Sequence, residues 1–571
     1  MKNTYKNFIA TIFILVASVI GVIAQPLVGI YTINSGQATG GTNFQSFSDF
    51  SIALATNGIS GNVIADVVIG SGPYNEQVVF TAVTGASPSA SVTINGNGET
   101  ITAVTTTTDR HVIRLMDVEF FNIDGLRINW NPASTGGFYG IHIFNTGNDI
   151  TITNCYVDLS GTTSTLYGAY VASGSETSIL TTGDFHNIFF SNDTAVGGGY
   201  GVSVFGLISD LATDIVISNN TFYDFHSNGV YLRETDGAVI KDNFFDKRTS
   251  NITSVNAIQL AQAANFNSQI FGNFIKVSQT NNGTMPFRGI YLFNGTGHKV
   301  YNNVIYDINL ISGDFTAIEV RTGGTAPEIY YNTISIDNPN QTTGELFGVS
   351  EELSNTNTVL MNNIISIEQP TTAVKAAYSI GSISNITNTF TSNYNGFNIP
   401  GGNIAYRNAT VPVPYPTLGD WQSISSQDMN SVEADPGFIS STNVVPTSGA
   451  MDNTGIVIPF VTTDIVGLTR SSTPDMGAYE FVQVGISSPE YINAVSMYPS
   501  PVHSDLNIVL NENNSQVRIE ILDITGKLIQ TNKIETTMKE VSMNVSSLAA
   551  GSYLVRIING DKLSIGRFVK N

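Results

Sequence analysis

The chain has 571 residues, more than one compact core usually holds, because single cores stop growing at roughly 250 to 300 residues. It contains 53 Gly, 31 Phe and 23 Tyr but 12% charged residues, against about 25% in typical globular domains, and this composition favours an elongated repeat. The formal net charge of -21 argues against a nucleic-acid-binding protein, since such proteins cluster Lys and Arg to neutralise phosphates. The acidity leaves open a solvated surface or cation binding, calcium included.

Residues 1–24 have the pattern of a signal peptide. Lys2 and Lys6 precede an apolar stretch over residues 8–24, and the polar Gln25 follows. The alternative is a retained membrane anchor, but the stretch is slightly short for a span and no other segment is long enough. We therefore predict a cleaved leader and a secreted mature chain that begins at Gln25 and has no membrane span.

A small residue followed by an alternating apolar triplet recurs between residues 139 and 380. The copies occupy residues 140–143, 168–171, 201–204, 229–232, 257–260, 289–292, 317–320, 348–350 and 377–380. Their starts are separated by roughly 28 to 33 residues, a period typical of stacked structural repeats. The alternation with period two makes each copy a β-strand.

A second apolar phrase, which ends in Asn, lies between these strands. Examples end at Asn154, Asn219-Asn220, Asn302-Asn303, Asn332 and Asn362-Asn363, and positions 272 (Gly272), 302, 332 and 362 are spaced by 30 residues. Stacked Asn side chains offer both a donor and an acceptor along the axis, and Asn tolerates the left-handed conformation of tight corners. Two registered strands per period predict an all-β solenoid rather than helical repeats.

The arrangement resembles the right-handed parallel β-helix superfamily, to which pectate lyases and related polysaccharide-active proteins belong. The resemblance covers residues 63–480 and implies this fold. We expect the β-helix and an N-terminal capping segment over residues 25–395, with a short amphipathic helix at 46–55 that closes the first coil. The period fades after residue 395, so residues 396–484 are expected to close the C-terminal end and 485–494 to form a linker.

Residues 495–571 resemble the type A sorting domains of the type IX secretion pathway. The matching residues are Tyr498, Pro499, Pro501, Gly526, Lys527, Gly551 and Tyr553, in four successive signatures that end with Arg567-Phe568-Val569-Lys570. Ser500 is the visible departure, because the family commonly has Asn there. The resemblance implies the type IX secretion machinery as a partner and a location outside the cell or on the outer-membrane surface. The alternation over 517–521 independently indicates a small C-terminal β-sandwich.

No catalytic constellation is found, and the catalytic residues are unknown. HExxH, Walker A, GxSxG and paired CxxC motifs are all missing from the sequence. The histidines, including His186, are not spaced as metal ligands, and no metal or other cofactor site is predicted. Hydrolases of the β-helix superfamily carry clustered aspartates that this chain lacks, whereas its lyases use Lys or Arg, often with calcium, and leave a weaker trace in the sequence.

The alternation of the apolar triplets indicates which side chains leave the solenoid. If the first and third apolar residues point inward, the intervening and following residues point outward. The outward set with suitable chemistry is Tyr170, Tyr231, Tyr291, Arg233, Glu319 and Arg321. The tyrosines could stack on sugars and the charged groups could pair with glycan carboxylates; the alternatives are rings packed beneath loops and ordinary solvated charges.

Three functions follow from this reading, in order of preference. The first is a surface protein that binds extended polysaccharides or other surfaces, as an adhesin does. The second is a polysaccharide lyase acting on glycans that contain uronic acids. The third is a structural surface protein, which would need neither the aromatic row nor the outward Arg and Glu side chains.

Overall fold

The computed structural model describes residues 25–571 except 251–252, 262–263, 279–284, 311, 322–325, 352–356, 382–389, 409, 482–496, 511–516, 525–526, 535–539 and 560–561. The expected signal peptide and the expected linker at 485–494 lie outside the described residues. The chain divides into two compact units, residues 1–481 and residues 482–571. In the described part of the chain, no helix combines the length and apolar character that a membrane crossing needs.

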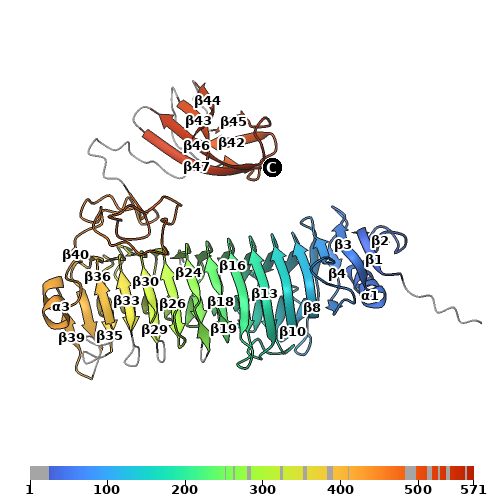
Figure 1. The fold of residues 1–571 in the computed structure, drawn as a ribbon, viewed down its shortest axis with the longest axis horizontal. Helices are drawn as coiled ribbons and strands as arrows, with labels where there is room; N and C mark the ends of the chain where they lie inside the picture. Colours follow the sequence, from blue (N-terminus) through green and yellow to red (C-terminus); the bar gives the residue numbers. More distant parts are fainter. Residues whose placement is uncertain are drawn as a thin grey trace, which may run out of the picture. The chain divides into compact units, whose positions relative to one another are not determined.

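The first unit is a right-handed parallel β-solenoid of about 12 turns, which confirms the predicted fold class (Figure 1). Its strands stack on three faces, here called face 1, face 2 and face 3. Face 1 consists of β5 (Val78–Thr81), the first halves of β8 (His111–Asp124) and β10 (Phe138–Thr153), β12 (Tyr167–Ser173), β15 (Tyr200–Phe205), β18 (Asn228–Arg233), β22 (Val255–Leu260), β26 (Phe287–Phe293), β29 (Phe315–Arg321), β32 (Leu346–Glu351), β35 (Lys375–Ile380) and β38 (Asn403–Arg407).

Faces 2 and 3 complete each coil. Face 2 consists of β1 (Leu27–Ile33), β3 (Ile59–Val67), β6 (Val92–Asn95), the second halves of β8 and β10, β13 (Asp184–Ser191), β16 (Ala212–Ser218), β20 (Val239–Lys241), β24 (Gln269–Phe271), β27 (Lys299–Tyr301), β30 (Glu328–Tyr330), β33 (Thr358–Met361) and β36 (Phe390–Asn393). Face 3 consists of β4 (Tyr74–Asn75), β7 (Thr100–Thr102), β9 (Arg127–Asn129), β11 (Tyr156–Leu159), β14 (Thr194–Gly197), β17 (Thr221–Tyr223), β21 (Phe244–Asp246), β25 (Phe274–Val277), β28 (Val304–Ile308), β31 (Thr333–Ile336), β34 (Ile364–Ile367), β37 (Gly396–Asn398) and β40 (Val432–Glu433). The short strands β2 (Asn43–Phe44), β19 (Thr235–Asp236) and β23 (Asn265–Phe266) extend the face 2 sheet.

The recurrent small residue of face 1 has a steric cause. A Cβ on Gly229 would lie 2.6 Å from the carbonyl oxygen of Ala257 and equally close to the ring of Phe245, which projects from face 3. The next residue, Val230, also points inward and is fully buried. Positions 229 and 230 therefore both face the core. The first must be a small residue, because the Phe245 ring from face 3 already fills the space that a larger side chain would need.

The predicted asparagine ladder forms along the corner between faces 2 and 3. Its members are Asn220, Asn243, Asn273, Asn303, Asn332, Asn363 and Asn395. From Asn220 to Asn363, the backbone N–H and the Nδ2 of each member both donate to Oδ1 of the Asn in the next coil. The residues that the sequence spaces by 30 do not all occupy the same place in the coil. Asn302 and Asn362 have a left-handed backbone at the corner and precede a ladder member, whereas Asn332 is itself a ladder member.

Both ends of the solenoid core are covered by a helix (Figure 1). The helix expected at 46–55 is α1 (Phe47–Asn57), whose N-cap Ser46 accepts a hydrogen bond from the Asp49 backbone and whose Phe47 and Phe50 are buried. At the other end, β39 (Val413–Tyr415) pairs antiparallel with β38, and α3 (Leu418–Ser425) buries Trp421 completely. The apolar cross-sections are therefore shielded from water.

Residues 434–481 return along the side of the solenoid instead of sealing its far end. Arg470 Nη2 donates to Oδ1 of Asn302 at 2.8 Å, and the backbone N–H of Ala478 donates to Thr333 Oγ1 at 2.8 Å. Ile458 and Val461 pack with Tyr331 and its neighbours in a separate apolar cluster. This segment thus braces the corner of several coils, a role that the expected closing function did not include.

The second unit contains two antiparallel sheets, as predicted. One sheet has the order β41 (Met497–Tyr498), β42 (Asp505–Val509), β45 (Glu540–Asn544). The other has the order β44 (Leu528–Ile534), β43 (Val517–Asp523), β46 (Gly551–Asn559), β47 (Lys562–Lys570). Leu506, Ile519 and Phe568 belong to its own hydrophobic core.

Candidate functional site

The outer surface of face 1 carries the predicted site residues in register. The residue between the two inward positions of each strand forms a central row, which runs through Tyr231, Gln259, Tyr291 and Glu319 on β18, β22, β26 and β29. Arg233 and Arg321 occupy the next outward position of β18 and β29. The parallel register therefore brings five of the six predicted residues onto one surface.

Tyr170 was expected on this surface, and that expectation is wrong. It pairs with Ile141 and Val202, both inward residues, and is fully buried in the core. Its hydroxyl donates to the carbonyl oxygens of Cys155 and Thr194, at 3.1 and 3.3 Å. Burial raises the pKa of the Tyr170 hydroxyl well above its usual value. No glycan can reach this ring.

Tyr231 points outward and is half-buried. Its ring meets that of Tyr200 edge to face, with centroids 5.7 Å apart. Desolvation is the main reason that the pKa of Tyr231 rises to about 12, so the phenol stays neutral and keeps its proton for hydrogen bonding. Tyr200, which sequence reasoning missed, is in the outward position that precedes the small residue Gly201.

Tyr291 also points outward, but 7% of it is exposed. The guanidinium of Arg288 lies 4.9 Å from its ring centroid, and the Phe293 ring is 5.8 Å away. Its hydroxyl accepts a hydrogen bond from Arg321 Nη1 at 3.4 Å. The expected role as an open stacking platform is therefore wrong for Tyr291, which instead supports the two arginines.

Glu319 lies between two arginines. Arg288 Nε donates to its Oε2, and Arg321 Nη1 is 3.9 Å from its Oε1. The Glu319 side chain is 12% exposed, whereas Arg321 is 40% exposed. Because one carboxylate faces two guanidinium groups, the cluster retains net positive charge at the surface. Arg288 was not predicted; it precedes the small residue Gly289, in the outward position that the Asn256–Arg288 register places on this surface.

Arg233 is anchored at the edge of the same surface. Its Nε donates to Oε1 of the fully buried Glu234 at 3.0 Å, and its guanidinium lies 4.5 Å from the Phe205 ring centroid. Glu234 has a left-handed backbone, with φ of 56°, at the turn from face 1 to face 2. The hydrogen bond to Glu234 fixes Nε of Arg233, and the Phe205 ring packs against the plane of its guanidinium. These two contacts orient the remaining N–H groups.

The N-terminal part of face 1 is covered by the 174–183 loop. Arg114 Nη1 donates to Glu176 at 2.6 Å, and Ile179 packs against Tyr139 and Val171. Burial and the neighbouring Arg114 lower the pKa of His142 to about 3, so this imidazole is neutral. The accessible surface therefore begins near β15, beyond this loop.

Two strongly shifted ionisable groups lie away from the surface. Glu351 occupies an inward position, where burial raises its pKa to about 7, and Thr358 Oγ1 donates to it at 3.2 Å. Lys247 is fully buried, and desolvation lowers its pKa to about 8. Shifts of this size are common at catalytic sites, but both side chains are closed to a polymer.

The sorting-motif residues lie in the second unit. Tyr498 is in β41 and is 48% exposed, Gly551 begins β46, and the Tyr553 hydroxyl donates to the Ala549 carbonyl at 3.0 Å. Pro499 and Pro501 follow β41, and Lys527 precedes β44. Gly526 lies outside the described residues.

Among curated proteins, none matches this chain. Solved structures with some likeness include a GH136 lacto-N-biosidase from Eubacterium ramulus, at 10% identity and TM-score 0.38, covering 65% of this chain and 68% of that one. Another is PfbA, a surface adhesin of Streptococcus pneumoniae, at 13% identity and TM-score 0.34, covering 58% and 88%. A third is the catalytic unit of a GH87 alpha-1,3-glucanase from Streptomyces thermodiastaticus, at 12% identity and TM-score 0.27, covering 69% and 71%. At these values the likeness carries no argument about activity.

The second unit has a family match. Residues 496–571 match the family model described as the secretion system C-terminal sorting domain. The match spans all seven sorting-motif residues named from the sequence. Proteins with this domain leave the cell through the type IX pathway. Residues 496–571 are therefore a secretion system C-terminal sorting domain, and the protein is exported to the cell surface or the extracellular space.

Proposed function

We propose that the protein binds extended anionic polysaccharides through the outer surface of face 1 between β18 and β29. The observation that supports this proposal is the placement of Arg233, Arg288 and Arg321 on one registered surface of a protein whose net charge is -21. Guanidinium groups make charge-assisted, often bidentate hydrogen bonds to carboxylates and sulfates. Arg233 and Arg321 are three coils apart, roughly 14 Å, so a polymer must be extended to meet both.

Binding without cleavage is favoured over hydrolysis by the chemistry of the central row. Glycoside hydrolysis usually employs two carboxyl groups that flank the scissile bond. From Tyr231 to Glu319, the central row carries one carboxylate, and two arginines already engage it. A lyase needs a base instead, and the arginines of this surface already contact carboxylates: Arg233 contacts Glu234, and both Arg288 and Arg321 contact Glu319.

Calorimetry with oligomers of a uronic acid, and with a neutral glucan as comparison, tests the proposal. We expect the acidic oligomers to bind, to lose affinity as salt rises, and to bind about tenfold or more weakly to Arg233→Ala and Arg321→Ala. Tyr231→Ala should weaken binding less, since its ring is half-buried. Arg127→Ala, which removes an arginine from face 3, is the matched control and should leave affinity unchanged.

Two results would count against the proposal. If the parent and both arginine variants bind every glycan with equal affinity, face 1 is not the binding surface. New ultraviolet absorbance from unsaturated products would show a polysaccharide lyase and overturn a function of binding alone.

A further inference from the structure

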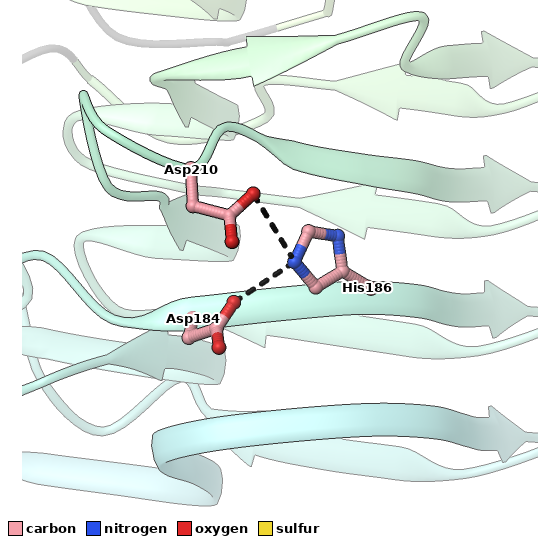
Figure 2. A group of neighbouring side chains, drawn as sticks. All are labelled: Asp184, His186 and Asp210. Atoms are coloured by element: carbon pink, nitrogen blue, oxygen red, sulfur yellow. Dashed lines mark ion pairs between the residues drawn. The ribbon is translucent and has the colours of Figure 1, made fainter.

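One group of side chains on face 2 has the composition of a metal site. Asp184 and His186 are two residues apart on β13, so both project from the same side of the strand. Asp210 comes from the turn that leads from β15 to β16 in the neighbouring coil. Their ligand-type atoms all lie within 4.8 Å of one another, and Figure 2 shows His186 Nε2 facing both carboxylates.

The contacts within this group differ from those of a hydrogen-bonded pair. Asp184 Oδ1 lies 2.8 Å from His186 Nε2, yet it is shielded from solvent and accepts no hydrogen bond from the described residues. The N–H direction of the imidazole is therefore not aimed at this oxygen. Asp210 Oδ1 lies 3.9 Å from the same nitrogen. Two ligands of one metal ion point at the ion and not at each other, and their ligand atoms lie roughly 3 to 4 Å apart. The atoms of this group have that arrangement.

The other imidazole nitrogen, Nδ1, contacts a side chain of the neighbouring coil. His186 Nδ1 lies 2.8 Å from Thr213 Oγ1, and Thr213 pairs with His186 in the parallel register. A proton on Nδ1, directed to this hydroxyl, leaves the Nε2 lone pair free for an ion that lies between the ring and the two carboxylates. Metal-bound histidines usually have such a partner, which fixes the ring orientation and the tautomer.

A second unsatisfied oxygen lies in the adjacent coil. Asn148 pairs with His186 in the β10–β13 register, so the two residues are neighbours along the outer surface of face 2. Its Oδ1 is buried and has no hydrogen-bond partner among the described residues. Two carboxylates, one orphaned amide oxygen in the next coil and one oriented imidazole favour a cation over a self-contained hydrogen-bond network.

We propose that Asp184, His186 and Asp210 bind one first-row divalent metal ion, with Zn²⁺ as the best fit. Imidazole nitrogen with carboxylate oxygen suits zinc and its neighbours, whereas calcium prefers six or more oxygen ligands. Asp210 is 65% exposed, which leaves room for water in the remaining positions. The ion joins the 206–211 turn to the preceding coil, beside Phe205, whose carbonyl oxygen accepts a hydrogen bond from Gly183.

Calorimetry on the tag-free, chelator-treated protein with Zn²⁺, Mn²⁺ and Ca²⁺ tests this site. We expect one Zn²⁺ per chain and at least about tenfold weaker binding of Ca²⁺. His186→Ala and Asp210→Asn should each weaken Zn²⁺ binding about tenfold or more, and Thr213→Val should weaken it by a similar factor through the lost orienting contact. Asp158→Asn on face 3 is the control and should bind as the parent does.

The melting temperature gives an independent readout. Zn²⁺ should raise it for the parent and for Asp158→Asn but not for His186→Ala or Asp210→Asn. Asp210 lies in an exposed turn, so its variant tests the site without damage to the core. The absence of saturable Zn²⁺ binding would overturn the proposal, and so would one-to-one binding that persists in both variants.

Discussion

Asp193 begins the asparagine ladder, where a carboxyl group takes the place of an amide. Its backbone N–H donates to Asn220 Oδ1, and its Oδ1 accepts from the Cys155 N–H, both at 2.8 Å. Oδ2 has no partner among the described residues, although Nδ2 donates at this point in the ladder members. Burial raises the pKa of Asp193 well above its usual value, so this carboxyl keeps its proton to a higher pH than an exposed aspartate does.

Asp193→Asn should stabilise the protein by about 1 to 3 kcal/mol at pH 8, because an amide restores the missing donor. The unfolded carboxyl ionises near pH 4, whereas the folded one stays protonated to a higher pH. The parent therefore loses stability as pH rises from about 4 toward the folded pKa, and the variant does not. Urea unfolding at pH 4 and pH 8 measures the difference, which should grow with pH. A stability difference between variant and parent that shrinks as pH rises would contradict the raised pKa of Asp193.

On face 1, the position of a single small residue determines which side chains of a strand point inward, and this explains why the prediction for Tyr170 is wrong. The copy at 168–171 contains two small residues, Gly168 and Ala169, and the repeat pattern alone places the first at the start of the phrase. The structure pairs Gly168 with Tyr200, so Ala169 is the small inward residue and Tyr170 enters the core. A shift of one residue moves every side chain to the other side of a strand. Where a copy has one small residue, as at Gly289, the predicted parity is confirmed by the burial of Ile290 and Leu292.

The segment over residues 434–481 depends on one buried arginine. Arg470 Nη1 pairs with Glu480 at 3.2 Å, Nη2 donates to Asn302 Oδ1 and the Gly477 carbonyl, and the guanidinium lies 3.7 Å from the Tyr331 ring centroid. Its side chain is 3% exposed. Removal of one partner from a buried ion pair leaves the other charge uncompensated.

Arg470→Leu should therefore destabilise the attachment of this segment by about 3 to 5 kcal/mol. Because damage in a solenoid stays local, we expect faster proteolysis within residues 434–481 and a smaller effect on the remaining coils. Glu328→Gln removes one partner of the partly exposed Lys299–Glu328 pair and should change stability by less than about 1 kcal/mol. Equal protease resistance of the parent and Arg470→Leu would contradict the bracing role.

Elements with local signals were predictable, and elements made by distant contacts were not. The strands of face 1, α1 and the left-handed corners follow from alternation, a capping serine and asparagine, all readable within a few residues. The path of residues 434–481 depends instead on contacts such as Asn302 with Thr463, which are 161 residues apart. The Asp184–His186 pair had a local signal, two potential ligands spaced by two on a strand, but Asp210 joins them only when the coils stack.

At the scale of the whole molecule, the two units have separate cores. The solenoid core extends from Leu27 to Trp421 as one apolar cluster, and the sorting domain has its own cluster, which includes Val502 and Phe568. Each unit buries its apolar side chains without the other. Such an organisation suits export, because a sorting domain that contributes nothing to the solenoid core can be recognised without any change in that core.

Removal of residues 482–571 should therefore leave the solenoid folded. We expect calorimetry of the full chain to show two melting transitions, and of the shortened chain to show the solenoid transition alone, shifted by less than about 2 °C. The reason is that each unit has a hydrophobic core built from its own residues. A single transition in the full chain, or a solenoid transition lowered by more than about 5 °C after removal, would show that the units depend on each other.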